Sequence, residues 1–399
     1  MAEPRLRRRE LLGAGVGAAT TLAFGAAFWK GAFDGGEASG SAARPGPRGA
    51  SYGPRGAPNP DGLRLPQGFS ARRVARGGEM VEGTDYRWHL ASDGAATFRT
   101  RDGGWILVSN SERQPGGAGA MRFTRGGEIA DAYRILDGTT QNCAGGATPW
   151  GTWLSCEEFE EGRVWECDPS GREKARVHEA MGVFKHEAAA VDRRGRRVYL
   201  TEDWEDGAFY RFTPRRWTDL SEGLLELARV GRRGAVEWVR VPDPAARRRP
   251  TRRQVRGTTE FKRAEGIWFD SGLVYLATTY DSRIQAYDTR RERIEVIYDA
   301  LASRKAPLVR VDNITASRGG ELFVCEDIAT DEINLGVMTR DHRVSKFISV
   351  TGKNHVDSEL TGLAFDPSGS RLYFSSQRAH GRKGEVYEVT GPFRGRRTG

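Results

Sequence analysis

Short hydrophobic segments separated by turns that contain Asp and Gly fill the chain from about residue 63 onward. Each unit reads as an apolar strand, a turn that contains Asp or Gly, and a second strand of large apolar residues that ends in Ser, Thr or an acid. No long stretch has the period of an amphipathic helix, so the pattern predicts an all-β fold. The units are Phe98–Ser109, Thr148–Ser155, Ala190–Thr201, Ile267–Thr278, Ile314–Cys325 and Leu363–Ser375.

The turns recur at a regular interval. Their glycines lie about 45–50 residues apart, except for one gap of about 77. They are Gly103, Gly151, Gly195, Gly272, Gly320 and Gly369. A β-propeller blade repeats at this interval, whereas a β-sandwich or a pair of β-domains has no reason to repeat one unit evenly. We therefore predict a β-propeller of about six blades, in which the wide gap, Leu224–Val241, holds an inserted element or the outer strands of a blade.

Acidic residues lie beside these strands at matching positions in several units. In a propeller the ends of the innermost strands meet at one mouth of the central channel. A single acid there caps a turn or pairs with an arginine, but several acids at one mouth repel one another and raise one another's pKa. Binding Ca²⁺, which prefers carboxylate, amide and carbonyl oxygens, relieves that repulsion. The candidates are Glu157, Glu158, Glu187, Glu202, Asp203, Glu265, Asp312, Asn313, Glu326 and Asp327.

Cysteine and histidine add a second kind of ligand. Cys143 lies in a glycine-containing turn, where two interpretations stay open: a disulfide with one of the other three cysteines, or a thiolate ligand to iron. His186, next to Glu187, is either a metal ligand or, as is commoner, a structural histidine. The other five histidines show no spacing typical of a zinc site.

The N-terminus predicts export. Arg7–Arg9 precede a weakly hydrophobic run rich in Gly and Ala, the pattern of a twin-arginine signal peptide over residues 1–30. A retained membrane anchor is the alternative. Residues 31–62 are rich in Gly, Pro and Ser and are interpreted as a linker, followed by a single propeller domain over residues 63–392. The expected partner is the twin-arginine export machinery, the expected location periplasmic or extracellular, and any membrane contact is through the signal or anchor.

The charge of the chain bears on its ligand. The formal net charge is +9, and arginines form dense runs at Arg247–Arg249 and Arg252–Arg253. A basic protein attracts anions, but no helix-turn-helix, zinc-finger or RNP pattern accompanies the charge, so no nucleic-acid partner is predicted. A small anionic substrate fits the charge better.

Several of these motifs together resemble one family, the PhoX-type alkaline phosphatases. The similar segments are NCAGGATPWGTWLSCEE at 142–158, KHEAAAVD at 185–192, VYLTED at 198–203, FKRAEGI at 261–267, VDNITAS at 311–317 and LFVCEDI at 322–328. The resemblance implies an exported β-propeller phosphatase that carries two Fe³⁺ and three Ca²⁺ ions and acts on a small phosphorylated substrate. This chain lacks long insertions found between the blades of the best-known members.

The resemblance also implies roles for single residues. Cys143 would be the iron-ligating thiolate, and Arg263 would hold the phosphate beside Glu265. The implied metal-bridging carboxylates are Glu158, Glu187, Glu202 and Glu265. The implied calcium ligands are Asp312, Asn313 and Glu326. The choices between Glu157 and Glu158, and between Glu326 and Asp327, stay open.

Two other functions fit the same acidic mouth. One is a calcium-dependent propeller hydrolase of lactones or other non-phosphate esters, which would need neither Cys143 nor Arg263. The other is a non-catalytic exported propeller that acts as a scaffold, for which metal would be unnecessary.

Overall fold

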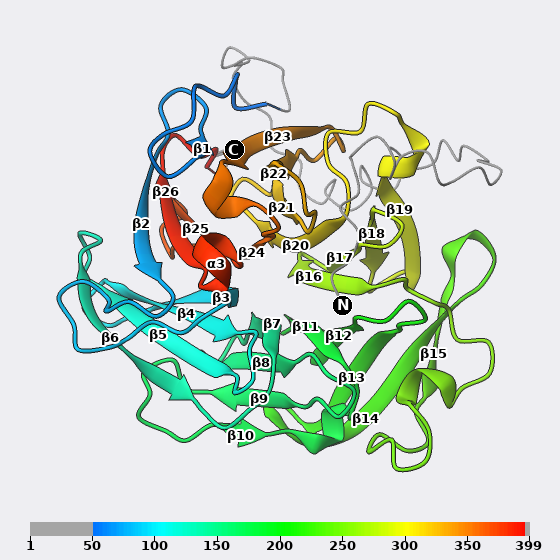
Figure 1. Ribbon diagram of the computed structural model, residues 1–399. Coiled ribbons are helices and arrows are strands. Elements are labelled where there is room, and N and C mark those ends of the chain that lie inside the picture. Colours follow the sequence, from blue (N-terminus) through cyan, green and yellow to red (C-terminus); the bar gives the residue numbers. More distant parts are fainter. Residues whose placement is uncertain (1–50, 396–399) are drawn as a thin grey trace, which may run out of the picture.

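Six antiparallel sheets surround a central axis in the computed structural model, which describes residues 51–395 (Figure 1). The predicted six-bladed β-propeller is therefore confirmed. Blade 1 holds β3 (Ser92–Arg99), β4 (Trp105–Ser111), β5 (Gly117–Phe123) and β6 (Ile129–Leu136). Blade 2 holds β7 (Asn142–Ala147), β8 (Trp153–Glu157), β9 (Val164–Cys167) and β10 (Arg176–Val177). Blade 3 holds β11 (His186–Asp192), β12 (Arg197–Glu202), β13 (Phe209–Arg216), β14 (Asp219–Val230) and β15 (Val236–Arg240).

The remaining three blades have the same plan. Blade 4 holds β16 (Ala264–Asp270), β17 (Leu273–Thr278), β18 (Arg283–Asp288) and β19 (Arg293–Asp299). Blade 5 holds β20 (Val311–Ala316), β21 (Leu322–Glu326), β22 (Glu332–Met338), β23 (Val344–Thr351) and β1 (Leu63–Arg64). Blade 6 holds β24 (Leu360–Phe365), β25 (Arg371–Ser376), β26 (Glu385–Thr390) and β2 (Ser70–Arg76). The helical turns are Glu179–Met181, Arg232–Gly234, Thr251–Arg253, Ala300–Ala302, Lys353–His355 and α3 (Ala379–Arg382). None of the helical segments between residues 51 and 395 has the length and hydrophobicity that a membrane span requires.

The first strands of the chain close the ring of blades. β2 pairs with β26, so the N-terminal strand forms the outer edge of the C-terminal blade. β1 pairs with β23 of blade 5. The wide gap in the repeat is explained by blade 3, where the long strand β14 pairs with an additional strand, β15. Residues 51–62 also contact the propeller, because the Tyr52 hydroxyl donates to Glu321 at 2.7 Å.

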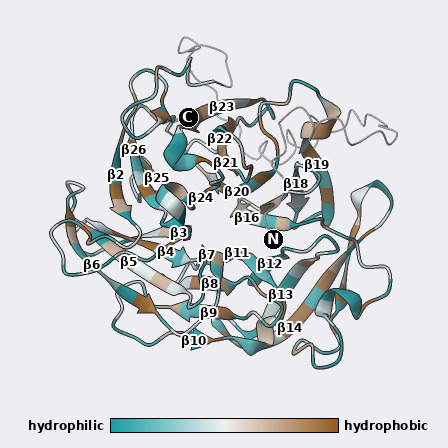
Figure 2. Ribbon diagram, viewed as in Figure 1, coloured by the Kyte–Doolittle hydropathy of each residue, from teal (hydrophilic) through white to brown (hydrophobic). Residues whose placement is uncertain are grey.

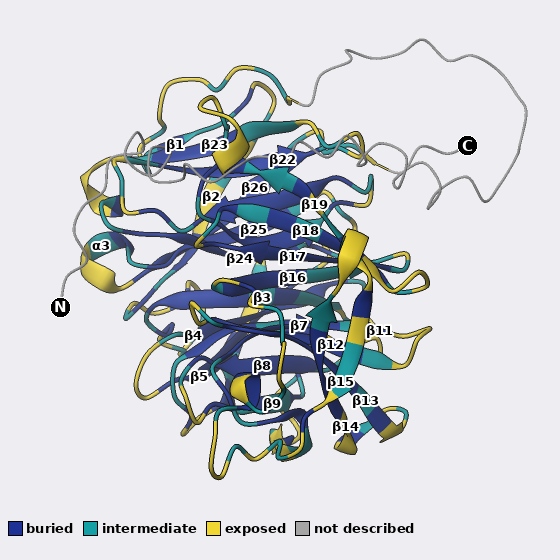
Figure 3. Ribbon diagram, turned by 90° about the vertical axis from the view of Figure 1, so that its right-hand side faces the viewer, coloured by how far each residue is buried: buried dark blue, intermediate teal, exposed yellow. Residues whose placement is uncertain are grey.

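The hydrophobic residues of the strands are buried between neighbouring blades, and exposed residues gather in the loops (Figures 2 and 3). The innermost strands of blades 1 to 3 instead carry mainly small residues where they line a channel of about 320 Å³, whereas those of blades 4 to 6 also present large residues such as Trp268 and Phe365. At Gly146 an added Cβ would come within 2.0 Å of the Ala189 carbonyl oxygen on the next blade. Glycine and alanine therefore allow the six inner strands to approach the axis closely.

All six innermost strands share a bulge close to their first residue. The pairing register between each inner strand and its neighbour shifts there. A bulge bends the strand and redirects side chains, which is why bulges are common beside functional sites. A backbone hydrogen bond across the preceding loop recurs in every blade, for example from Asp203 N to Lys185 O and from Asp327 N to Arg310 O. Each blade thus presents equivalent positions to the same mouth.

Candidate metal centre

Two sets of equivalent positions surround this mouth. The second residue of each innermost strand forms what we term the inner ring. It consists of Asp93, Cys143, Glu187, Glu265, Asp312 and Thr361. The residue that follows each second strand forms the outer ring. It consists of Glu112, Glu158, Asp203, Thr279, Asp327 and Gln377.

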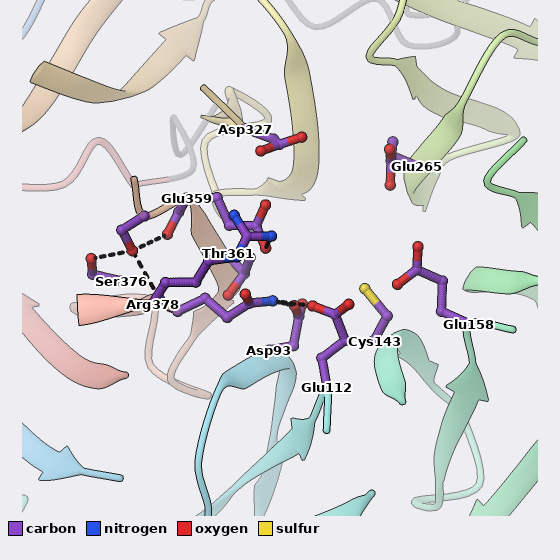
Figure 4. A network of polar contacts seen from close by, with 12 residues as sticks. Asp93, Glu112, Cys143, Glu158, Glu265, Asp327, Glu359, Thr361, Ser376 and Arg378 are labelled. Carbon is purple, nitrogen blue, oxygen red and sulfur yellow. Dashed lines mark hydrogen bonds and ion pairs between the residues drawn. The ribbon is translucent and has the colours of Figure 1, made fainter. Parts of the chain in front are cut away.

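The rings place acids and one thiol together in a buried space. In Figure 4 the sulfur of Cys143 and the carboxylates of Glu112 and Glu158 point toward a shared space from different strands. Three groups have ligand atoms that all lie within 4.8 Å of one another. They are Asp93–Glu112–Cys143, Cys143–Glu158–Glu187 and Glu187–Glu265–Asp312. Because Cys143 and Glu187 each belong to two groups, the three form one continuous series across blades 1 to 5.

Some carboxylate oxygens of this cluster have no hydrogen-bond partner within residues 51–395. Oε2 of Glu187 and Oδ1 of Asp312 are buried and have no hydrogen-bond partner among the described residues. Glu187 is only 1% exposed. Burial, followed by the nearby Glu265 carboxylate, raises the pKa of Glu187 well above its usual value. Such orphaned acids are costly in a protein interior unless a cation completes them, so these residues fit a bound metal.

Cys143 occupies the junction of two of the groups. Its Sγ lies 3.4 Å from Oε1 of Glu187. Burial, followed by the Asp93 carboxylate, raises the pKa of the thiol well above 9.0. A metal would favour the thiolate, since coordination removes the proton. All four cysteines, Cys143, Cys156, Cys167 and Cys325, are unpaired, so the disulfide interpretation is wrong.

The donor sets of the groups differ. The two that contain Cys143 combine sulfur with carboxylate oxygens, which suits a transition metal such as iron. The third, Glu187–Glu265–Asp312, offers oxygen alone, which suits Ca²⁺.

Lysine and arginine side chains form ion pairs with other acids of the two rings. Nζ of Lys185 lies 2.8 Å from Glu158 and 2.7 Å from Asp203. Arg263 lies 2.8 Å from both Asp203 and Glu265, and 3.5 Å from Asp327. Although burial opposes ionisation, Arg263 and Lys185 hold the pKa of Asp203 below its usual value. Asp203 is therefore ionised and paired without a metal, whereas burial raises the pKa of Glu158 and of Glu265 well above the usual value.

The backbone fixes the position of Arg263. Its φ is 51°, in the left-handed region that costs a residue other than glycine about 1–3 kcal/mol. Its N–H donates to the Trp204 carbonyl oxygen at 2.8 Å, and its own carbonyl oxygen accepts from Thr279 N at 2.9 Å. Both bonds fix the main chain from which the guanidinium of Arg263 reaches Asp203 and Glu265.

Two predicted ligands do not reach the cluster. Glu202 accepts from Tyr210 at 2.7 Å and from Arg252 at 2.8 Å, inside blade 3. Glu326 accepts from the backbone N–H groups of Val309 and Asn334 at 2.8 and 2.9 Å. Each is the last residue of its strand, and successive strand residues point to opposite faces. The next residues, Asp203 and Asp327, occupy the outer ring instead.

The remaining predictions divide in the same way. Glu158 belongs to the cluster, whereas Glu157 accepts from the backbone N–H groups of Thr140 and Arg163. Asn313 lines the central channel, and its Oδ1 lies 3.4 Å from Leu363 N. His186 bonds the Gly182 carbonyl oxygen at 3.0 Å, as expected for a structural histidine.

Blade 6 completes the mouth with neutral and paired groups. The Gln377 amide donates to both Asp93 and Glu112, so these carboxylates are bridged from that side. Arg378 bonds Glu359 at 2.8 Å. Thr361 occupies the inner-ring position, and its hydroxyl donates to the Ser92 carbonyl oxygen at 3.1 Å.

Asp93 and Glu112 were missed by the sequence analysis. A signal was present, because Asp93 is followed by Gly94, Ala95 and Ala96, just as Glu187 is followed by three alanines. An acid followed by small residues marks the point where an innermost strand enters the channel.

Comparisons with known proteins agree with this architecture. Residues 115–295 match the family model described as "Alkaline phosphatase PhoX", so the resemblance to this family is confirmed over that segment. No curated protein sequence matches the chain. The structure of Pseudomonas fluorescens PhoX in complex with vanadate, a transition state analogue, is similar with a TM-score of 0.69 at 15% identity. That match covers 86% of this chain and 98% of the other.

A second similar structure is XC5397 from Xanthomonas campestris, described as a gluconolactonase. It is 14% identical with a TM-score of 0.48, covering 85% of this chain and 98% of the other. At 15% identity, the likeness to the Pseudomonas fluorescens structure establishes the propeller fold and not the reaction.

Proposed function

We propose that this chain is an exported, metal-dependent phosphatase that hydrolyses phosphomonoesters at the propeller mouth. The proposal rests mainly on one observation: five blades bring one thiol and several acids into a single buried cluster. Some carboxylate oxygens of this cluster have no hydrogen-bond partner in the described part of the chain, and the chain contains a segment that matches the PhoX family. Fe³⁺ and Ca²⁺ are the proposed ions, with iron beside Cys143 and calcium beside Asp312.

The chemistry of phosphoryl transfer suits such a cluster. Charge develops on the oxygens of the transferred group, and the attacking and leaving oxygens must lie in line. Metal ions held here would neutralise that charge and orient the ester.

Arg263 is the residue that we propose binds the phosphate group of the substrate. The side chain of Arg263 is 26% exposed, so its planar fork borders both the cluster and the solvent. We assign it to the phosphate oxygens, for which an arginine fork is well matched. Glu265, 2.8 Å away, would hold Arg263 in place while it ligates metal.

Export and domain organisation belong to the same proposal. Residues 1–30 would be the twin-arginine signal and 31–62 a linker whose last part, residues 51–62, contacts the propeller, with the enzyme in residues 63–392 acting in the periplasm or outside the cell. The signal lies outside the described residues. Phosphate esters outside the cytoplasm would be its small substrates.

The test is hydrolysis of p-nitrophenyl phosphate by the purified, metal-loaded chain, repeated after treatment with EGTA. We expect activity that EGTA abolishes and that Glu187→Gln lowers by at least about 100-fold, the effect of losing a group that binds the catalytic metals. Glu222→Gln, an exposed acid on β14, is the control and should retain full activity. Activity indifferent to EGTA and to Glu187→Gln would reject the proposal.

A further inference from the structure

A loop rich in arginine lies beside the metal centre, and only some of its cations have partners. Arg247 pairs with Asp243 at 3.0 Å. Arg252 pairs with Glu202 at 2.8 Å, and Arg253 with Asp206 at 2.7 Å. The two arginines between them, Arg248 and Arg249, are exposed, and their guanidinium groups bond no other residue of 51–395.

The loop is braced. The Gln254 side chain accepts from Asp243 N at 2.8 Å and donates to the carbonyl oxygens of Asp243 at 2.8 Å and Arg249 at 2.9 Å. These bonds span the segment from both ends. The backbone that carries the two unpaired arginines is therefore preorganised, which lowers the entropy cost of binding a ligand there.

The same loop is attached to the mouth. Val183 N donates to the Pro244 carbonyl oxygen at 2.8 Å. Two residues later, Lys185 reaches Glu158 of the metal cluster. The point at which the loop is attached is therefore two residues along the chain from a residue that contacts the cluster.

A cavity of about 640 Å³ separates the loop from blades 2 and 3. Its charged lining holds five arginines and three glutamates, an excess of positive charge. Of these glutamates, Glu160 already accepts from Trp204 Nε1 at 2.8 Å and lies 3.5 Å from Arg252. Glu160 is also two residues beyond Glu158, so one wall of the cavity is continuous along the chain with a residue of the metal centre.

We infer that this cavity is a second anion subsite, in which Arg248 and Arg249 bind a second phosphate of the substrate while the first is hydrolysed at the metal centre. The inference rests on the proposed function. Two free guanidinium forks offer planar pairs of N–H donors, the geometry that matches phosphate oxygens. The volume accommodates a phosphate and the sugar-sized group that links it to the scissile ester. The substrate class is thus a bisphosphorylated ester in preference to a monophosphate.

The test compares fructose 6-phosphate with fructose 1,6-bisphosphate, using the metal-loaded wild type and the double variant Arg248→Ala/Arg249→Ala. We expect the double variant to raise KM for the bisphosphate by about tenfold, since a charge-assisted bond contributes enough for that change. KM for the monophosphate should stay within about twofold. The matched control is Arg193→Ala/Arg194→Ala, two exposed arginines in the turn between β11 and β12 that make no side-chain bond to another described residue.

Calorimetric titration with tripolyphosphate provides a readout independent of turnover. We expect about tenfold weaker binding in the Arg248/Arg249 double variant and no change in the control. Equal values for the double variant and the wild type, or equal losses for both sugar phosphates, would overturn the subsite. If the wild type releases phosphate from neither sugar, the proposed function fails, and the titration alone decides whether the subsite exists.

Discussion

The thiol of Cys143 on blade 2 lies 3.4 Å from a carboxylate oxygen of Glu187 on blade 3, although 44 residues separate them in the chain. Both residues take the second position of an innermost strand, where the shared bulge redirects the side chain. Propeller symmetry thus converts a repeated position in the sequence into a contact between two potential ligands.

This contact makes Cys143 the most specific test of iron binding. We expect Cys143→Ser to weaken iron affinity by at least about 10–100-fold, because the variant loses the only sulfur donor in the cluster among the described residues. Iron per chain, measured by elemental analysis after dialysis, checks this. Cys156→Ala is the control, since Cys156 is also buried in blade 2 but packs in the hydrophobic core. Full iron retention in Cys143→Ser would contradict the assignment.

Arg263 is expected to contribute to stability as well as to substrate binding. Arg263→Ala would leave the carboxylates of Asp203 and Glu265 without their shared cation, and removing one partner of a buried ion pair costs about 3 kcal/mol. Urea denaturation of the metal-free protein measures the difference. Arg216→Ala, which removes an exposed pair with Asp219, should change the free energy of unfolding by less than about 1 kcal/mol. If both variants changed the free energy of unfolding equally, Arg263 would not stabilise the buried carboxylates in the way proposed.

The acids of the mouth predict how stability depends on pH. Burial, followed by the neighbouring Glu112, raises the pKa of Asp93 from 3.8 to about 7 in the absence of metal. Between these two values the folded state binds a proton that the unfolded state has lost. Raising the pH through this window therefore lowers the free energy of unfolding of the metal-free protein.

Bound Ca²⁺ should restore the stability that the metal-free protein loses as the pH rises. Because Ca²⁺ needs ionised carboxylates and binds only the folded state, we expect it to raise Tm more at pH 8 than at pH 5.5. Thermal unfolding with EGTA and with excess Ca²⁺ at both values measures this. Asp93→Asn should reduce the pH dependence of the EGTA-treated sample. A larger Ca²⁺ effect at pH 5.5 would be inconsistent with acids that ionise to bind the ion.

The sequence predicted the repeat, the blade number and most of the acids that converge. It was less able to decide which of two adjacent acids faces the mouth. Glu202 and Asp203 are both acidic, yet only Asp203 reaches the cluster, because the side-chain direction alternates along a strand and a one-residue difference reverses it. The exact end of each strand decides the outcome, and strand ends are the hardest feature to read from sequence.

Other features depended on contacts between distant segments. Lys185 and Arg263 each bind Asp203, and together they show which acids are already neutralised. The sequence does not reveal that Lys185 and Arg263 share Asp203, since the two residues lie 78 positions apart. From the sequence, the arginine run likewise predicted only a positive charge. The structure shows that some of these arginines form ion pairs, whereas Arg248 and Arg249 form none with the residues it describes.

The central claim is that this mouth binds metal ions through Cys143 and the acids around it. Anomalous diffraction at the iron edge, from crystals of protein exported by its own signal, tests it most directly. The account predicts a strong peak at bonding distance from Cys143 Sγ and a carboxylate oxygen of Glu158 or Glu187. A mouth without any metal peak, in protein that still hydrolyses phosphate esters, would contradict it.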